Sequence, residues 1–147
     1  GVGLAGALGA RLAAQGGAAL VIDYGHAVGG TGETLQALRA HEYADPLDGP
    51  GAADITAHVD FGALAAVARG AGAATHGPVS QGVFLAALGI VQRAERLARD
   101  KDAAGRGVIE SELKRLIAPS EMGNLFKVLA ITDPRLGPPA GFEAPPF

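Results

Sequence analysis

The chain of 147 residues has the length of one domain, and with 48% hydrophobic but only 5% aromatic residues it must build its core from Ala, Leu, Val and Ile. A net charge of −3, from 12 basic and 15 acidic residues without a basic block, does not favour a nucleic-acid partner. The lack of cysteine excludes disulfides and thiolate metal sites, and no leader peptide or apolar run of ~20 residues is evident, so we expect an intracellular protein without a membrane partner.

The chain begins with glycine inside a predicted helix. Leu4, Leu8 and Leu12 recur at helical spacing, and Gly16 and Gly17 suit a left-handed helix end. Because the sequence opens in mid-element, we expect a piece of a longer protein. The alternative is a processed or badly delimited gene product.

A fully apolar run over residues 18–22 ends in the polar sequence Asp23-Tyr24-Gly25-His26. A continuous apolar run is typical of a parallel strand covered on both faces, and ligands of open α/β sheets bind at the carboxyl ends of such strands. The run therefore predicts a buried parallel strand over 18–23, with residues 23–26 at the rim of a site. A glycine-rich turn follows over 26–32.

The next elements are shorter. Alternation over residues 34–43 predicts one strand, the Pro- and Gly-rich segment 45–51 predicts a loop, and residues 55–59 predict a second strand. Asp60 is a good N-cap for a following helix that ends near Gly70.

The second half of the chain is expected to be mainly helical. After a turn at Gly77-Pro78, residues 80–100 predict the longest helix, and residues 109–117 predict an amphipathic helix that ends before Pro119. Charge is densest over 93–106, where a solvated helix end and loop is favoured over a partner-binding patch.

The chain closes with three short segments. A short helix over 122–126 is expected to start from a Ser120 cap, and residues 127–132 predict a last strand, antiparallel if it closes a sheet. The tail over 133–147 holds five of the nine prolines and is expected to be extended. The predicted domain thus covers residues 1–132, followed by the tail.

His58 and Asp60 lie two apart on a predicted strand, so their side chains would share a face, as an acid–base couple or a metal pair requires. Capping and structural hydrogen bonding is the favoured interpretation of Asp60. A metal is disfavoured because the other histidines, His26, His41 and His76, have no metal-like spacing.

Two further candidates have equally plain alternatives. Asp23 and Tyr24 could orient a ligand or polarise a nucleophile, or could be a helix-capping Asp with Tyr as a lid on the core. Gln81 could present its amide to a substrate, or could be an ordinary residue of the first helical turn.

Several enzyme classes lose support from missing or isolated motifs. Gly1, Gly3 and Gly6 match the letters of the dinucleotide fingerprint, but neither a preceding strand nor the required acidic residue accompanies them, so an NAD-dependent oxidoreductase is a remote alternative. The chain has no Gly-x-Ser-x-Gly, Walker or His-Glu-x-x-His motif, which disfavours hydrolases and nucleotide triphosphatases.

One set of ordered segments resembles a known family over nearly all of residues 1–132. The segments are 20–26 (LVIDYGH), 34–37 (TLQA), His41, 45–47 (DPL), 50–61 (PGAADITAHVDF), 77–85 (GPVSQGVFL), 88–90 (LGI) and 122–129 (MGNLFKVL). Together they resemble the carboxyl-terminal half of the MidA-like S-adenosylmethionine-dependent methyltransferases, whose mitochondrial members are complex I assembly factors that methylate a protein arginine.

The resemblance implies an α/β fold, the carboxyl-terminal part of a seven-stranded class I methyltransferase fold. The family's glycine-rich loop for the donor precedes the matched region, so the resemblance implies that the donor-binding part is missing here. It also implies S-adenosyl-L-methionine as cofactor of the complete protein, with none binding this chain alone, and a protein partner with an acceptor arginine. A homodimer is left open. The expected location is cytoplasmic in a bacterium and the mitochondrial matrix in a eukaryote.

An arginine acceptor stays protonated up to a pH of about 12 and needs carboxylates to orient its guanidinium group. On position and chemistry, the candidate catalytic residues are Asp23, Asp60 and His58, and the candidate substrate-binding residues are Tyr24, His26, Asp54 and Gln81. We therefore expect the carboxyl-terminal portion of a protein arginine methyltransferase, inactive alone. The non-enzymatic alternative is a protein-binding or assembly module derived from such an enzyme.

Overall fold

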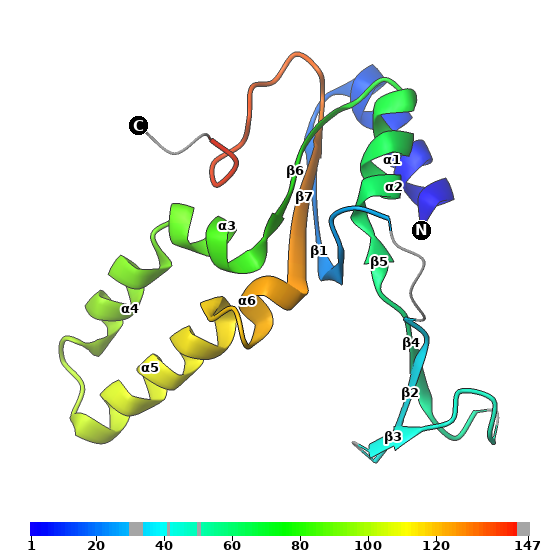
Figure 1. Ribbon diagram of the computed structural model, residues 1–147. Coiled ribbons are helices and arrows are strands. Elements are labelled where there is room, and N and C mark those ends of the chain that lie inside the picture. Colours follow the sequence, from blue (N-terminus) through cyan, green and yellow to red (C-terminus); the bar gives the residue numbers. More distant parts are fainter. Residues whose placement is uncertain (30–33, 41, 50, 144–147) are drawn as a thin grey trace.

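A computed structural model describes residues 1–29, 34–40, 42–49 and 51–143 (Figure 1). It is a mixed α/β fold, as the sequence predicted. In chain order its elements are α1 (Val2–Gln15), β1 (Ala18–His26), β2 (Gln36–Arg39), β3 (Glu42–Ala44), β4 (Asp54–Thr56), β5 (Val59–Asp60), α2 (Phe61–Gly70), β6 (Ala74–Ser80), α3 (Gln81–Ala87), α4 (Ile90–Ala98), α5 (Ala103–Ile117), α6 (Met122–Leu125) and β7 (Phe126–Thr132).

The main sheet has the strand order β5-β1-β7-β6. The last strand, β7, lies between β1 and β6 and is antiparallel to both, which confirms the antiparallel strand predicted near the end of the chain. β1 pairs with β7 along most of its length, from Ala18 opposite Thr132 to Tyr24 opposite Phe126. Only at its end does β1 pair in parallel with β5, at Gly25 and His26.

The helices α1 and α2 cover one face of this sheet, as Figure 1 shows, and both were predicted. The core between them includes Phe61, Leu129 and Ile131, each at most 1% exposed. α1 buries Ala5, Gly9 and Leu12, while Leu4 stays 75% exposed. A small residue is needed at Gly9 because a Cβ there would lie 2.9 Å from the Ala68 carbonyl oxygen.

The prediction that β1 is a parallel strand covered on both faces is wrong for most of the strand. Leu20 is 50% and Ile22 is 47% exposed, while Ala19 and Val21 pack against the core under the helices. The two sets differ because successive side chains of a strand point to opposite faces. An uninterrupted apolar run does not reveal which face is covered.

The segment predicted as one strand over 34–43 instead contributes to a second, three-stranded sheet with the order β3-β2-β4. The chain turns at Ala40, which has a positive φ of 50°, so β2 and β3 form an antiparallel pair. His41 lies outside the described residues. The strand predicted over 55–59 is also divided, because β4 joins this second sheet and β5 joins the main sheet.

The single helix predicted over residues 80–100 is wrong, because the chain breaks at Gly89 into α3 and α4. Gly89 has φ 80° and ψ 34°, a left-handed conformation that ends a helix. The turn predicted at Gly77-Pro78 is also wrong, since both residues lie within β6 and are joined by a cis peptide bond.

The remaining helices lie near their predicted positions. α5 ends at Ile117, as expected from Pro119, and begins after an Asp102 cap whose carboxylate accepts a hydrogen bond from the Gly105 N–H at 2.8 Å. The short helix α6 is confirmed, but its N-cap is Glu121 and not Ser120. Among the described residues, no helix combines the length and hydropathy that crossing a bilayer requires.

The described part of the tail, residues 133–143, returns toward the sheet in two turns (Figure 1). The Phe142 ring lies 5.2 Å from Phe84 and 6.4 Å from His76 between ring centroids. Residues 144–147, with two of the tail's prolines, lie outside the described residues. The predicted division of the chain at residue 132 stays a prediction.

Candidate functional site

Three strands of the main sheet run parallel to one another and end at the same edge. β1 is parallel to β5, and both β1 and β6 are antiparallel to β7, so β1 and β6 share one direction. Their last residues are His26, Asp60 and Ser80. We call this the carboxyl edge. It is where ligands of α/β sheets collect, and it includes the predicted rim residues 23–26.

An aromatic cluster lies at the carboxyl edge. His58 Nδ1 and His26 Nε2 are 3.2 Å apart, and the two ring centroids are separated by 4.8 Å. The Tyr24 ring lies edge-on to His58 and to Phe126, with centroids 5.7 Å apart in both cases. All four side chains are partly buried. Because one imidazole nitrogen must donate and the other accept, at least one ring has to be neutral for this hydrogen bond.

Gly25 explains why the two histidines meet. A Cβ at this position would collide with the carbonyl oxygen of Val59, so only glycine allows β1 and β5 to approach this closely. The resulting register sets His26 opposite Asp60. His58 immediately precedes β5 and is thereby carried to the side of His26.

The two candidate carboxylates each use one oxygen for a local hydrogen bond. Asp60 Oδ1 accepts from the Ala63 N–H at 2.9 Å, which confirms the predicted helix cap. Asp23 Oδ1 accepts from the Tyr24 N–H at 2.8 Å, a bond within its own strand. The second oxygen of Asp60 faces Gly29, where an added Cβ would lie 3.2 Å away. Each carboxylate therefore keeps an oxygen that a ligand could use.

Two other predicted site residues lie apart from the cluster. Gln81 is only 7% exposed, and its amide nitrogen donates to the Leu116 carbonyl oxygen at 2.9 Å. This position favours the structural alternative for Gln81. Asp54 lies exposed in β4 of the second sheet.

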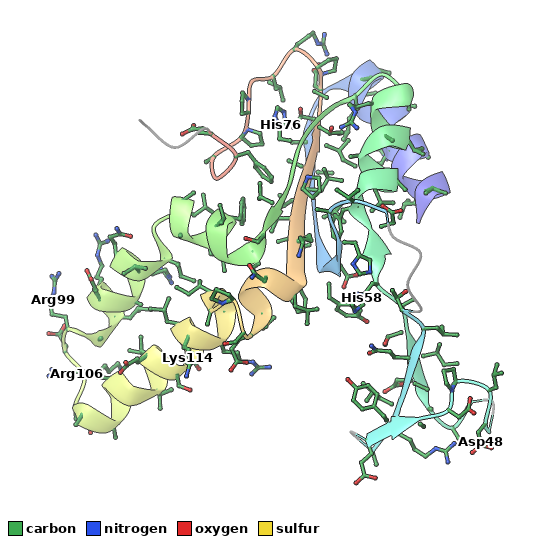
Figure 2. The ribbon with its side chains drawn as sticks, viewed as in Figure 1. Asp48, His58, His76, Arg99, Arg106 and Lys114 are labelled. Carbon is green, nitrogen blue, oxygen red and sulfur yellow. The ribbon has the colours of Figure 1, made fainter. Side chains whose placement is uncertain are left out.

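His76 is also distant. It bonds through Nε2 to the Thr132 hydroxyl at 3.2 Å, and Figure 2 places it and His58 toward opposite ends of the main sheet. Phe126 was not among the predicted site residues. The sequence feature that could have identified it is the predicted last strand: if that strand is antiparallel to β1, its first residues lie at the same edge as the last residues of β1.

Among the described residues there is no cluster of metal ligands, and the glycines of α1 form no phosphate-binding turn. In this described part of the chain, no three His, Asp or Glu side chains are placed to hold a metal, and every buried side-chain polar atom has a hydrogen-bond partner. The space beside Gly25 is filled by the Val59 backbone. Gly3 and Gly6 lie inside α1, with Gly6 against Val67, so they form no phosphate-binding turn.

A family model described as "Putative S-adenosyl-L-methionine-dependent methyltransferase" matches residues 3–79. The chain is 39% identical over 128 residues to the mitochondrial protein arginine methyltransferase NDUFAF7 homolog of Drosophila melanogaster, covering 86% of the chain and 29% of that protein. The identity to mitochondrial NDUFAF7 of Rattus norvegicus is 41%, over 82% of the chain and 28% of the relative. The chain thus spans less than a third of the length of these curated relatives.

Two solved structures from Burkholderia thailandensis share the fold. One native crystal structure superposes with a TM-score of 0.85 and 34% identity, over 96% of this chain and 39% of that one. A second, bound to S-adenosyl-homocysteine, gives a TM-score of 0.81 at 34% identity, over 96% of this chain and 38% of the other. Nearly the whole of the chain therefore corresponds to a part of a larger protein in each case.

Proposed function

The chain belongs to this family of S-adenosyl-L-methionine-dependent methyltransferases, and from that premise we propose that it is the carboxyl-terminal portion of a protein arginine methyltransferase. The observation that carries the proposal is its similarity to relatives named as protein arginine methyltransferases, which match it over 82% or more of its length. Their names also favour the mitochondrion for a eukaryotic protein, where the matrix is the expected compartment, with the cytoplasm expected in a bacterium. The partner would be a protein with an acceptor arginine.

The open edge of β1 supports the view that another part of the enzyme completes the sheet. On the side away from β7, the described residues pair with β1 only at Gly25 and His26. An edge strand with unpaired N–H and C=O groups is a ready partner for a further strand, and a strand paired along residues 18–24 would extend the sheet toward seven strands. The half-exposed Leu20 and Ile22 point to the face of β1 opposite α1 and α2, where helices of that other part could cover them.

The carboxyl edge offers the features that an acceptor arginine requires. The rings of Tyr24, His26 and His58 present surfaces on which a planar guanidinium can stack. The free oxygens of Asp23 and Asp60 could accept charge-assisted hydrogen bonds from its N–H groups.

Proton removal is the second requirement, because arginine is charged before transfer and the neutral nitrogen is the nucleophile. A neutral imidazole of the His26–His58 pair, or one of the two carboxylates, could accept that proton. The family's methyl donor supplies the electrophilic methyl group when bound. Asp54 and Gln81 stay predictions and carry no part of this proposal.

Calorimetry with S-adenosyl-L-methionine tests the assignment of the donor site to another part of the enzyme. We expect no saturable heat with the 147-residue chain alone, because the family resemblance implies that the donor-binding loop precedes the matched region. The longer protein that contains the chain should bind the donor. Saturable binding by the chain alone would contradict the proposal.

The acceptor side is tested in that longer protein by replacing the histidines one at a time. His26→Gln and His58→Gln should lower methyl transfer to an arginine peptide, with His76→Gln as the matched control at the other end of the sheet. Equal loss in all three variants would mean that only the fold was damaged.

The second candidate is a protein-binding module without methyltransferase activity. It rests on the same ring surfaces and free carboxylate oxygens at the carboxyl edge, which could bind an arginine without transferring a methyl group. Tight binding of the longer protein to its partner, with no methyl group appearing in the partner's mass, would establish this alternative.

A further inference from the structure

The helices α4 and α5 form an antiparallel pair that extends away from the main sheet, and we call residues 90–117 the helical arm (Figure 1). Neither helix has a buried residue, although both contain large apolar side chains. Leu97 is 50% and Val108 is 58% exposed. The contacts between the two helices therefore leave much of their apolar surface open to solvent.

An apolar groove follows the seam between the two helices. It has a volume of about 170 Å³ and is lined mainly by Ile90, Leu97, Ile109, Leu113 and Leu116, with one basic and one acidic residue, Arg93 and Glu112, also in its lining. A neighbouring hollow on α4, of about 320 Å³, is lined by Leu88, Arg93, Arg96 and Leu97 among others. Arg93 and Leu97 line both hollows, so the two form one continuous surface of leucines and guanidinium groups.

The charge of the arm is opposite to that of the rest of the chain. Residues 90–117 hold seven of the 12 basic residues and five of the 15 acidic ones, a net charge of +2, whereas the remaining 119 residues carry a net charge of −5. In the part of the chain that the structure describes, the ion pair of Asp133 with Arg135 is the one within 4.0 Å, so the arm's cations are unpaired there. Figure 2 shows Arg99 and Arg106 at the outer end of the arm.

We propose that the helical arm is a docking surface for an acidic amphipathic helix of a protein partner. The apolar groove would take leucine-type side chains spaced three and four apart, and Arg93 and Arg96 would bind carboxylates that flank them. Arg93 and Arg96 beside the apolar groove select against a basic helix.

The probe for this surface is a fluorescently labelled synthetic helix of about 18 residues with leucine on one face and glutamate on the other, mixed with the whole 147-residue chain. Anisotropy should show saturable binding that weakens at high ionic strength. A peptide with lysine in place of glutamate should bind at least about tenfold more weakly. No methyl donor is present, so failure here is distinguishable from failure of the proposed enzyme.

Three variants locate the binding. Arg96→Glu and Leu97→Ser should each weaken the binding of the acidic peptide by about tenfold, a difference of about 1.4 kcal/mol in binding free energy. Arg11→Glu is the control, because it makes the same charge change on an exposed residue of α1 and should have little effect on binding. Unchanged circular dichroism checks that each variant folds.

Several outcomes would overturn the proposal. Equal weakening by Arg11→Glu and Arg96→Glu would show a non-specific charge effect. Self-association in sedimentation that Leu97→Ser abolishes would identify a second copy of the chain as the occupant. Binding to vesicles containing phosphatidylserine without binding to the acidic peptide would identify a membrane.

Discussion

At the scale of single residues, the position of Gly25 decides whether the candidate site exists. A side chain there would meet the Val59 carbonyl oxygen, and the short pairing of β1 with β5 depends on this contact. The same contact sets the hydrogen bond of 3.2 Å between His26 and His58. The arrangement of His26 and His58 at the carboxyl edge therefore depends on glycine at position 25.

We expect Gly25→Ala to lower the free energy of unfolding by about 1–3 kcal/mol, because the new methyl group must displace the backbone of β5. Gly3→Ala is the matched control, since Gly3 lies in α1 with no heavy atom within 4 Å of an added Cβ. The free energy of unfolding of the Gly3→Ala variant should rise by about 0.5–1 kcal/mol. Urea unfolding measures both, and a Gly25→Ala protein as stable as the parent would refute the close approach of the two strands.

A second residue-scale prediction concerns pH. The pKa of Asp133 lies below its ordinary value of 3.8, mainly because the Arg135 side chain donates hydrogen bonds to the carboxylate, the shortest at 2.7 Å. A lowered pKa in the folded state stabilises the fold above the unfolded value, and this contribution is lost as the pH falls through the folded value. Unfolding free energy should therefore decrease on acidification below about pH 4 more steeply in the parent than in Asp133→Asn.

The control for this titration is Asp48→Asn, which removes an exposed carboxylate from the turn between β3 and β4. It should leave the steeper acid dependence of the parent in place. Identical pH profiles for the parent and Asp133→Asn would show that the Asp133–Arg135 pair does not contribute to stability.

At the scale of elements, Gln81 connects two helices that are far apart in the sequence, α3 and α5. Leu116 lies in the last turn of α5, where backbone carbonyl groups lack a partner within the helix. The Gln81 amide at the start of α3 supplies that partner at 2.9 Å. The base of the helical arm is thus held by a side chain that could equally have been assigned to a substrate.

Gln81→Leu should cost about 0.5–1.5 kcal/mol of unfolding free energy, because the part-buried hydrogen bond from Gln81 to the Leu116 carbonyl is lost. Gln92→Leu, at an exposed position of α4, should change it by less than about 0.5 kcal/mol. Thermal or urea unfolding compares the two. If the Gln81→Leu variant has normal stability but the longer protein that carries it fails to bind an arginine peptide, Gln81 must be assigned to substrate binding.

At the scale of the whole molecule, the sheet is well protected at its centre and open along one strand. β7 lies between two partner strands, and its residues Val128, Leu129, Ala130 and Ile131 are each at most 2% exposed. On its outer side, β1 has a partner only at residues 25 and 26. The molecule thus has a stable centre beside an edge that another strand could join.

Hydrogen exchange should show this difference. We expect amides of β7 to exchange slowest, while alternate amides over residues 18–24, those directed away from β7, exchange fast because they have no partner among the described residues. In the longer protein the same amides should become protected by a neighbouring strand. Slow exchange of every β1 amide in a monomeric sample of the chain would contradict the open edge.

The sequence by itself determined the local features of this protein, because these depend on neighbouring residues. Asp60 as a helix cap, the helix end at Gly16 and the polar residues after residue 22 all follow from side-chain chemistry within a few positions. The resemblance to a methyltransferase family also came from the sequence, through segments such as 54–61. That family assignment is confirmed.

Only the tertiary structure decided which segments meet. The contact between His26 and His58, the cover on a single face of β1 and the bond from Gln81 to Leu116 join residues that are far apart in the chain. Periodicity also missed the break at Gly89, since the apolar positions on either side continue the helical spacing while the backbone adopts a left-handed conformation. Such features are set by long-range packing, whose free energy outweighs the local preferences on which a sequence prediction depends.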